Sequence, residues 1–312
     1  IAQMKDGIII INTARGKLIN DADLAAALKS GKVGAAAIDV YRQEPPAPDN
    51  PLLGLPNVLH TPHLGAITRE AQHVVAIQIA DQVLEALRGT DYANTLNMPF
   101  RVGGGGYAEI RPFMELAEKL GVLHKALSGG LIKRVEVEVQ GDTVSELVRA
   151  IAAGILKGLV DKEADMPINY INAPIVAAEN GITITQAKGI KGLDYPNLIT
   201  CRAEWEGGQR TLSGVLFGGG EPRIVQVDQI QLDARPEGVV LIMGNRDVPG
   251  VIGRVGTMLA RYQVNIGEWR LGRDKPGGAA LSFINLDSEP PQEVLDELAT
   301  IAGVTGVKLV TL

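Results

Sequence analysis

The sequence has almost no cysteine, few aromatic residues and no long apolar run. Cys201 is the only cysteine among 312 residues, so the chain can form no internal disulfide bond and no metal site built from several thiolates, which fits a reducing cytoplasm. No apolar run approaches the roughly 20 residues that a membrane-spanning helix needs. The net charge of -6 gives no reason to expect nucleic acid or an anionic membrane as a partner. We therefore expect a globular, cytoplasmic protein that binds neither.

Three chemical signatures are also missing from the sequence. No G-x-G-x-x-G opens a strand-to-helix turn, so no glycine-rich loop for a dinucleotide pyrophosphate is visible. The four histidines show no helical ligand spacing, and His60 and His63 would point to opposite faces of an extended chain, which argues against a metal site. The absence of a nucleophile elbow argues against a Ser-His-Asp hydrolase.

The length and the 46% of hydrophobic residues are sufficient for two or three domains with proper cores. Residues 101–106 contain four consecutive glycines, which lose much conformational entropy on ordering and therefore predict a linker. We place domains at residues 1–99, 100–236 and 237–312.

Residues 1–99 have the pattern of an α/β sheet. The run Ile8 to Ile11 predicts a parallel strand that is apolar on both faces and covered by helices on each side. Further strands are expected at 33–40 and 57–61, with a helix capped by Asn20 between the first two. Thr68 can cap a long amphipathic helix that reaches about Arg88.

One arginine, one carboxylate and one histidine follow these strands: Arg15, Glu44 and His63. The carboxyl ends of parallel strands meet at one edge of a sheet, where such sheets bind ligands. A guanidinium can hold a carboxylate with two hydrogen bonds, and an imidazole supported by a carboxylate can carry a hydroxyl proton with a pKa near neutrality. Alone, each residue is more often structural, as we expect for His60, His73 and His124, the last as a favourable charge at a helix end. Together the three favour hydride chemistry on a 2-hydroxy acid.

The same segments resemble the D-isomer-specific 2-hydroxyacid dehydrogenase family. The resemblance is carried by the stretch 4–16, the block 36–40, Glu44 with Pro45, and the stretch 57–65. It implies NAD as cofactor, Arg15 as the substrate carboxylate ligand, His63 as the acid/base and Glu44 as its partner. It also implies that the nicotinamide end of NAD contacts Thr13, Ala14, Arg15, Asp39, His63, Leu64, Gly65 and Ala66. The implied fold is the C-terminal half of a Rossmann-type nucleotide domain.

The rest of the chain predicts two α+β domains. Residues 109–125 and 143–159 have helical periodicity, the second after a Thr143/Glu146 capping box, and strands are expected at 132–139, 199–217 (a hairpin) and 223–227. Residues 238–312 show the order βαββαβ, which predicts a ferredoxin-like domain with a four-stranded antiparallel sheet and two helices on one face.

These domains resemble the intervening regulatory domain and the ACT domain of the long, regulated family members, which oxidise 3-phospho-D-glycerate at the first step of serine biosynthesis. The resemblance implies phosphate binding by Arg223 and Arg235, and binding of L-serine by Asn245, Asp247 and Asn265 in a homodimer or homotetramer. Asp and Asn at turns also serve as plain turn residues, and arginines as solvated surface residues, so both interpretations stay open. An isolated sensing fragment without catalysis, or a dehydrogenase for another D-2-hydroxy acid, are the alternatives. We expect the chain to be the C-terminal portion of a longer enzyme and inactive alone.

Overall fold

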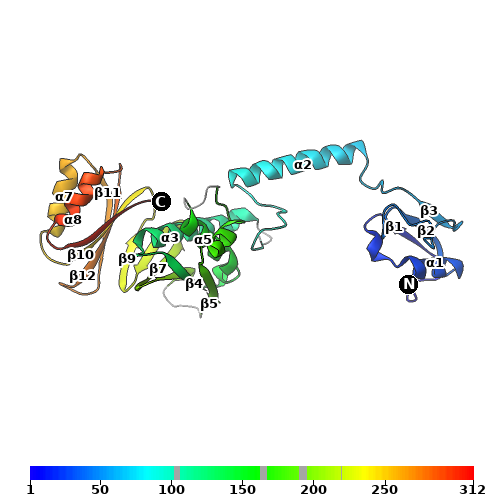
Figure 1. Ribbon diagram of the computed structural model, residues 1–312, viewed down its shortest axis with the longest axis horizontal. Helices are drawn as coiled ribbons and strands as arrows, with labels where there is room; N and C mark the ends of the chain where they lie inside the picture. The colour runs from blue at the N-terminus through cyan, green and yellow to red at the C-terminus, as the bar shows by residue number, and fades with distance from the viewer. Residues whose placement is uncertain (102–105, 162–166, 190–194, 219) are drawn as a thin grey trace. The chain divides into compact units, whose positions relative to one another are not determined.

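The computed structural model describes residues 1–101, 106–161, 167–189, 195–218 and 220–312 (Figure 1). It divides into two compact units, Ile1–Leu87 and Arg88–Leu312, which are described separately. Residues 102–105 of the predicted linker and the Thr143 side chain of the predicted capping box lie outside the described parts.

The N-terminal unit is built on a parallel sheet in the order β1-β2-β3. Asn20 caps the helix as predicted, because its side chain accepts hydrogen bonds from the backbone N–H groups of Ala22 and Asp23. Leu24 and Leu28 of this helix are buried against the sheet. The elements are β1 (Ile8–Asn12), the 3-10 helix η1 (Gly16–Leu18), α1 (Asp21–Lys29), β2 (Val33–Ile38), β3 (Val58–His60) and α2 (Arg69–Arg88).

The prediction that the first strand is covered on both faces is wrong for the structure as described. Ile9 and Ile11 are 66% and 70% exposed, whereas Ile8 and Ile10 pack against the core of this unit. The physical reason is that the buried face contacts α1, while no described element covers the other face.

Helix α2 begins after Thr68, whose hydroxyl accepts a hydrogen bond from the Ala71 backbone N–H at 3.1 Å. This matches the predicted cap and the predicted end at Arg88. None of its residues is buried. No helix within the described ranges combines the length and the apolar character needed to cross a membrane.

The C-terminal unit contains a six-stranded sheet in the order β5-β4-β6-β7-β8-β9, against which α3 and α5 pack (Figure 1). The hairpin predicted at 199–217 is present as β6 and β7, with Gly207 at a φ of 82° in its turn. The elements are α3 (Tyr107–Leu127), β4 (Ile132–Gln140), α4 (Asp142–Ser145), α5 (Val148–Val160), α6 (Ala173–Glu179), β5 (Thr183–Lys188), β6 (Leu198–Trp205), β7 (Gly208–Phe217), β8 (Glu221–Val227) and β9 (Ile230–Ala234).

Two details of this region differ from the sequence predictions. The helix predicted at 143–159 is split into α4 and α5 around residues 146 and 147. His124 is fully buried rather than a charge at a helix end, and its Nε2 donates a hydrogen bond to the Cys201 carbonyl at 3.0 Å. Burial lowers the His124 pKa from 6.5 to about 4, so the side chain is neutral at pH 7.

The last part of the chain has the predicted βαββαβ order and forms an antiparallel sheet in the order β11-β12-β10-β13. Its two helices lie on one face of that sheet, as Figure 1 shows. The elements are β10 (Val239–Arg246), α7 (Val251–Arg261), β11 (Ile266–Arg273), β12 (Ala279–Leu286), α8 (Gln292–Thr300) and β13 (Val304–Thr311).

The helix-free face of this second sheet packs on the six-stranded region. Val240, Ile242 and Phe283 belong to the same buried cluster as Leu116 of α3 and Ala234 of β9. Strand β9 passes so close to β11 that a Cβ added at Gly272 would overlap the backbone of residue 231. One buried apolar cluster therefore extends across the two folds of the C-terminal unit, while a second cluster lies between the last sheet and its helices.

Candidate active site

Arg15 lies in a turn at the carboxyl end of β1 that a buried asparagine organises. The side chain of Asn12 donates to the Arg15 carbonyl at 3.1 Å and accepts from the Ala14 backbone N–H at 3.2 Å. Asn12 is only 6% exposed, so both bonds are protected from water. The side chain therefore fixes the turn that presents the guanidinium of Arg15.

His63 and Glu44 form the hydrogen-bonded pair that the sequence predicts. His63 Nδ1 lies 2.8 Å from Glu44 Oε2. Because an ionised carboxylate only accepts, Nδ1 carries the proton in this pair. The hydrogen bond from His63, followed by one from the Tyr41 backbone N–H, lowers the pKa of Glu44 below its usual value. Nε2 is the ring nitrogen left for a substrate.

Asp39 holds the turn that carries His63. Its carboxylate accepts hydrogen bonds from Thr61 Oγ1 at 2.5 Å and from the backbone N–H groups of Leu64 and Gly65 at 2.7 and 2.8 Å. These donors, Thr61 first, lower the Asp39 pKa. His63 itself has a φ of 57°, an unusual value for a residue with a Cβ. The network around Asp39 therefore stabilises a backbone conformation that the histidine alone disfavours.

Tyr41 connects three parts of the site, and the sequence analysis missed it. Its backbone N–H donates to Glu44 Oε1 at 2.9 Å, and its hydroxyl lies 2.5 Å from His60 Nδ1. Its backbone also packs so closely on Gly16 that a Cβ there would overlap the Tyr41 carbonyl carbon. The only available signal was the position of Tyr41 between two predicted site residues.

Arg15, Glu44 and His63 line one cavity of about 490 Å³. The remaining lining residues are Gly16, Lys17, Val40, Tyr41 and Arg42. Both members of the imidazole–carboxylate pair are partly open to solvent, with exposed side-chain fractions of 49% for His63 and 40% for Glu44. The cavity thus offers a guanidinium for a carboxylate beside a nitrogen base that a ligand can reach.

Of the predicted nicotinamide contacts, Arg15 and His63 line this cavity, and five others lie within three residues of them in the chain. Thr13 and Ala14 follow β1 and are exposed, as are Leu64, Gly65 and Ala66 after β3. These positions fit the nicotinamide end of NAD, because exposed turns at the carboxyl ends of two strands flank the end of a third. Asp39, the remaining predicted contact, is 4% exposed, and its carboxylate accepts hydrogen bonds from the backbone of the His63 turn.

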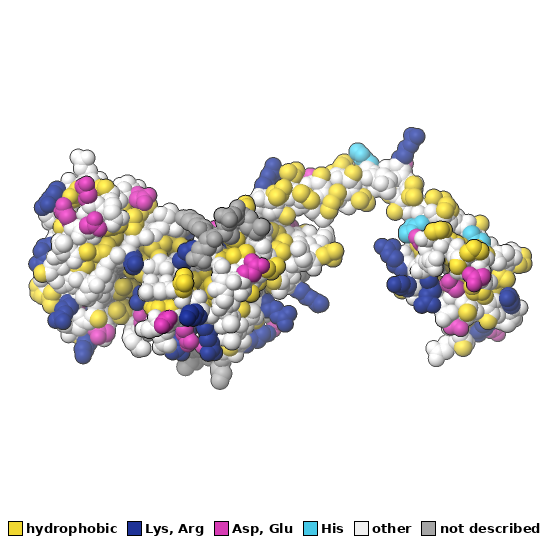
Figure 2. Space-filling model, in the orientation of Figure 1, with side chains coloured by type: hydrophobic (Ala, Val, Ile, Leu, Met, Phe, Trp, Pro, Cys, Tyr) yellow, Lys and Arg dark blue, Asp and Glu magenta, His cyan; other side chains and the backbone are white. Residues whose placement is uncertain are grey.

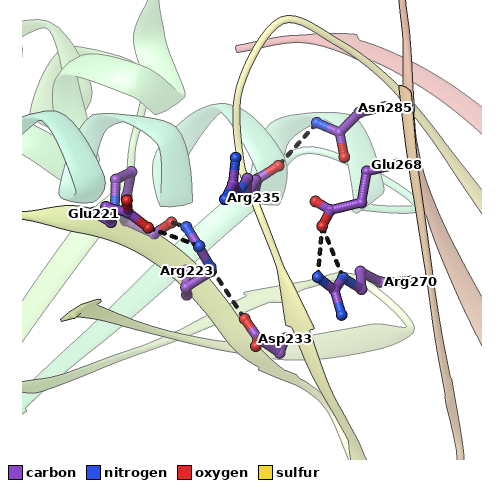
Figure 3. A network of polar contacts seen from close by, with 8 residues as sticks. Glu221, Arg223, Asp233, Arg235, Glu268, Arg270 and Asn285 are labelled. Atoms are coloured by element: carbon purple, nitrogen blue, oxygen red, sulfur yellow. Dashed lines mark hydrogen bonds and ion pairs between the residues drawn. The ribbon is translucent and has the colours of Figure 1, made fainter. Parts of the chain in front are cut away.

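The candidate phosphate ligand Arg223 is already engaged with carboxylates. Figure 3 shows it between Glu221 and Asp233, at 2.8 Å from Glu221 Oε2 and 3.2 Å from Asp233 Oδ1. It also donates to the Pro222 carbonyl, and its side chain is only 12% exposed. Arg235 is exposed, and its backbone carbonyl accepts a hydrogen bond from Asn285. A phosphate at Arg223 would have to displace one of these acids.

The candidate effector residues of the ACT region lie at two ends of its sheet. The carboxylate of Asp247 accepts from Arg273 at 2.8 Å and from the Gly277 backbone N–H, and the bond from Arg273 lowers the Asp247 pKa. Asn265 precedes β11 and donates to Asp287, at the opposite end of that strand from Arg273. Asn245 is 4% exposed and bonds within its own sheet. Within one chain, Asp247 and Asn265 cannot hold the same small ligand.

A metal centre is not indicated. Within the described ranges, no group of three or more His, Cys, Asp or Glu side chains could hold a metal ion.

Comparisons with family models of known proteins find matches in three stretches of the chain. Three family models match: the NAD binding domain of D-isomer specific 2-hydroxyacid dehydrogenase at residues 1–65, the D-3-phosphoglycerate dehydrogenase intervening domain at 109–228, and the ACT domain at 239–303.

Curated relatives match nearly the whole chain. D-3-phosphoglycerate dehydrogenases from Archaeoglobus fulgidus and Methanocaldococcus jannaschii are 39% and 38% identical over 312 residues, covering 99% and 100% of this chain and 59% of each relative. The Synechocystis enzyme of the same name is 35% identical over 97% of this chain and 55% of its own length. The chain therefore spans somewhat more than half of the relatives that it matches. Along this length the chain is similar to D-3-phosphoglycerate dehydrogenases, and residues 1–65 match the NAD binding domain of D-isomer specific 2-hydroxyacid dehydrogenase.

Proposed function

We propose that the N-terminal unit supplies the substrate and acid/base residues for NAD-dependent oxidation of 3-phospho-D-glycerate to 3-phosphohydroxypyruvate, the first step of serine biosynthesis in the cytoplasm. The observation that carries the proposal is the convergence of Arg15, Glu44 and His63 on one cavity, with the imidazole and carboxylate hydrogen-bonded. The homology to enzymes named for this substrate supports it.

Each side chain has a role that follows from its chemistry. Arg15 binds the substrate carboxylate with two parallel hydrogen bonds and so orients the C2 hydroxyl. His63 Nε2 accepts the hydroxyl proton as C2 becomes a carbonyl, and Glu44 stabilises the imidazolium that forms. Asp39 and Tyr41 position these groups through the contacts at Leu64, Gly65 and Glu44.

NAD, when bound, supplies the acceptor for the hydride that leaves C2. Thr13, Ala14, Leu64, Gly65 and Ala66 would hold its nicotinamide end. The G-x-G-x-x-G pattern for the pyrophosphate does not occur in the 312 residues, so we expect this chain alone to show no NAD-dependent turnover.

The C-terminal unit has a regulatory role in this proposal. L-serine binds the ACT domain between two copies, because Asp247 and Asn265 of one chain lie toward opposite ends of β11 and cannot hold the same small ligand. The protein is then at least a homodimer, and a homotetramer is a pair of such dimers. A phosphate-bearing ligand binds near Arg235 and competes with Glu221 and Asp233 for Arg223.

The active-site proposal is tested by titrating the 312-residue chain with 3-phospho-D-glycerate and following the His63 imidazole by NMR, with the signal assigned from His63→Gln. We expect a saturable shift that Arg15→Leu weakens by about 10- to 100-fold, the equivalent of one strong charge-assisted contact. A shift that Arg15→Leu leaves unchanged, or no shift in the parent chain, contradicts the proposal.

The effector proposal is tested separately by thermal unfolding with L-serine. A ligand that binds only the folded state must raise the melting temperature, and Asp247→Ala should abolish the rise. No rise at millimolar serine contradicts the assignment of serine.

A further inference from the structure

Two cations that the proposed reaction does not use line the same cavity as Arg15. They are Lys17, in the 3-10 helix after Arg15, and Arg42, in the loop between Asp39 and Glu44. Figure 2 shows Lys and Arg side chains gathered beside a histidine on the N-terminal unit. The cavity therefore has three cationic side chains and one carboxylate among its lining residues.

The ion pairing of these two cations differs from that of Arg223 in the C-terminal unit. In the part of the chain that the structure describes, neither Lys17 nor Arg42 forms a salt bridge, whereas Arg223 contacts two carboxylates. Both side chains are exposed, so their charges are available to a ligand. Uncompensated cations around a small cavity raise the local concentration of anions and favour ligands with more than one negative group.

The backbone brings residues 17 and 42 close to one another in the fold. Gly16 packs against the backbone of Tyr41 and Arg42, and a Cβ at residue 16 would overlap both. Lys17 directly follows Gly16, and Arg42 directly follows Tyr41. The backbone contact between the Arg15 turn and the Glu44 loop therefore also fixes the backbone positions from which the Lys17 and Arg42 side chains extend.

We propose that Lys17 and Arg42 determine specificity by binding a second anionic group of the substrate, a phosphate, while Arg15 holds its carboxylate. This inference rests on the proposed function, since it assigns two residues to the same site. A phosphate monoester carries between one and two negative charges at pH 7, which suits a pair of cations with no carboxylate partner. The hydroxy acid without its phosphate loses these contacts and keeps those to Arg15 and His63.

The experiment compares two ligands that differ only in the phosphate: 3-phospho-D-glycerate and D-glycerate. Dissociation constants are measured from the His63 imidazole shift for the parent chain, Lys17→Gln, Arg42→Gln and the double variant. Lys29→Gln, at the exposed end of α1, is the matched control. Melting temperatures of all variants establish that the N-terminal unit is folded.

We expect each single variant to raise the dissociation constant for 3-phospho-D-glycerate by about 3- to 10-fold, the range of one partly exposed charge-assisted contact. The dissociation constant for D-glycerate should change by less than about twofold. The phosphorylated ligand should also lose more affinity between 50 and 200 mM salt. Inorganic phosphate is the third ligand, and it should compete with 3-phospho-D-glycerate but not with D-glycerate.

The outcomes separate this inference from the proposal beneath it. If both hydroxy acids shift His63 and the variants weaken them equally, or weaken neither, Lys17 and Arg42 do not bind phosphate and only this inference fails. If neither ligand shifts His63 in the parent chain, the active-site proposal and this inference fail together. If inorganic phosphate competes with D-glycerate as well, phosphate binds at Arg15 and the assignment is overturned.

Discussion

The candidate ligand-binding charges of the two units differ in their surroundings. In the N-terminal unit, Glu44 and His63 are 40% and 49% exposed and line a cavity with Arg15. In the C-terminal unit, Arg223 is 12% exposed and is held by two carboxylates, and Asp247 is held by Arg273. A guanidinium held by carboxylates of the fold must give one of them up to bind an anion, whereas one that faces a cavity can bind a ligand directly.

This comparison explains why arginines in similar sequence contexts have different partners in the structure. An arginine near a strand end looks the same in sequence whether its partner is a substrate or a neighbouring acid. The structure separates the two cases through the neighbours of each guanidinium. Asn12 fixes the turn of Arg15 without touching its charge, whereas Glu221 and Asp233 neutralise Arg223 directly.

The largest expected effect comes from Gly16→Val, which attacks the contact between the Arg15 turn and Tyr41. The new side chain would overlap the Tyr41 backbone, so we expect the N-terminal unit to lose about 3 kcal/mol and His63 to stop responding to 3-phospho-D-glycerate. Thermal unfolding and the NMR titration measure the two effects. Gly256→Ala on α7, where nothing lies within 4 Å of the added carbon, is the control and should retain the response.

The buried His124 should make the stability of the C-terminal unit depend on pH. The unfolded chain binds a proton at this histidine near pH 6.5, but the folded chain does so only near pH 4. The free energy of unfolding should therefore fall by about 3 kcal/mol as pH is lowered through that window. His124→Asn should flatten the profile, and His73→Gln on exposed α2 should not. An unchanged profile in His124→Asn would show that other groups cause the acid sensitivity.

Asp39→Asn tests whether the His63 turn depends on a paired charge. The amide cannot accept the bonds from Thr61, Leu64 and Gly65 as strongly, so we expect about 2 kcal/mol of destabilisation and a weaker His63 response. Unfolding curves and ligand titration measure both. Asp49→Asn, at an exposed loop position of the same unit, should change stability by less than about 0.5 kcal/mol. Equal effects at both positions would remove the positioning role.

The smallest expected effect is a difference in the free energy of unfolding between substitutions of Arg223 and Arg15. Arg223→Gln removes both ion pairs of a mostly buried guanidinium and should cost about 1 kcal/mol in the C-terminal unit. Arg15→Gln should change the stability of its own unit by less than about 0.5 kcal/mol. Denaturant unfolding followed separately for each unit makes the measurement. The reverse order would break the distinction between paired and ligand-facing charges.

Much of the fold follows from local sequence signals. The Asn20 cap, the Thr68 cap and the βαββαβ order of the last domain were predicted because each depends on near neighbours in the chain. Strands β5 and β9 were missed, since both are short edge strands of six and five residues, and β5 has little alternation. The burial of His124 was also missed, because it depends on packing of α3 against β6, far away in sequence.

The candidate site was predictable in its residue types but not in its support. Arg15, Glu44 and His63 follow predicted strands, and α/β sheets bind ligands at the carboxyl ends of their strands. The roles of Tyr41 and Gly16 arise from contacts between segments 25 residues apart, for which the sequence has no periodic signal. Only the cavity in the structure shows that Lys17 and Arg42 belong to the same site.

The most direct test of the central claim is a crystal structure of the 312-residue chain with 3-phospho-D-glycerate. We predict that the ligand carboxylate forms two hydrogen bonds with Arg15 and that its C2 hydroxyl lies within about 3 Å of His63 Nε2. A ligand bound elsewhere on the chain, or one whose hydroxyl faces away from His63, would contradict the account.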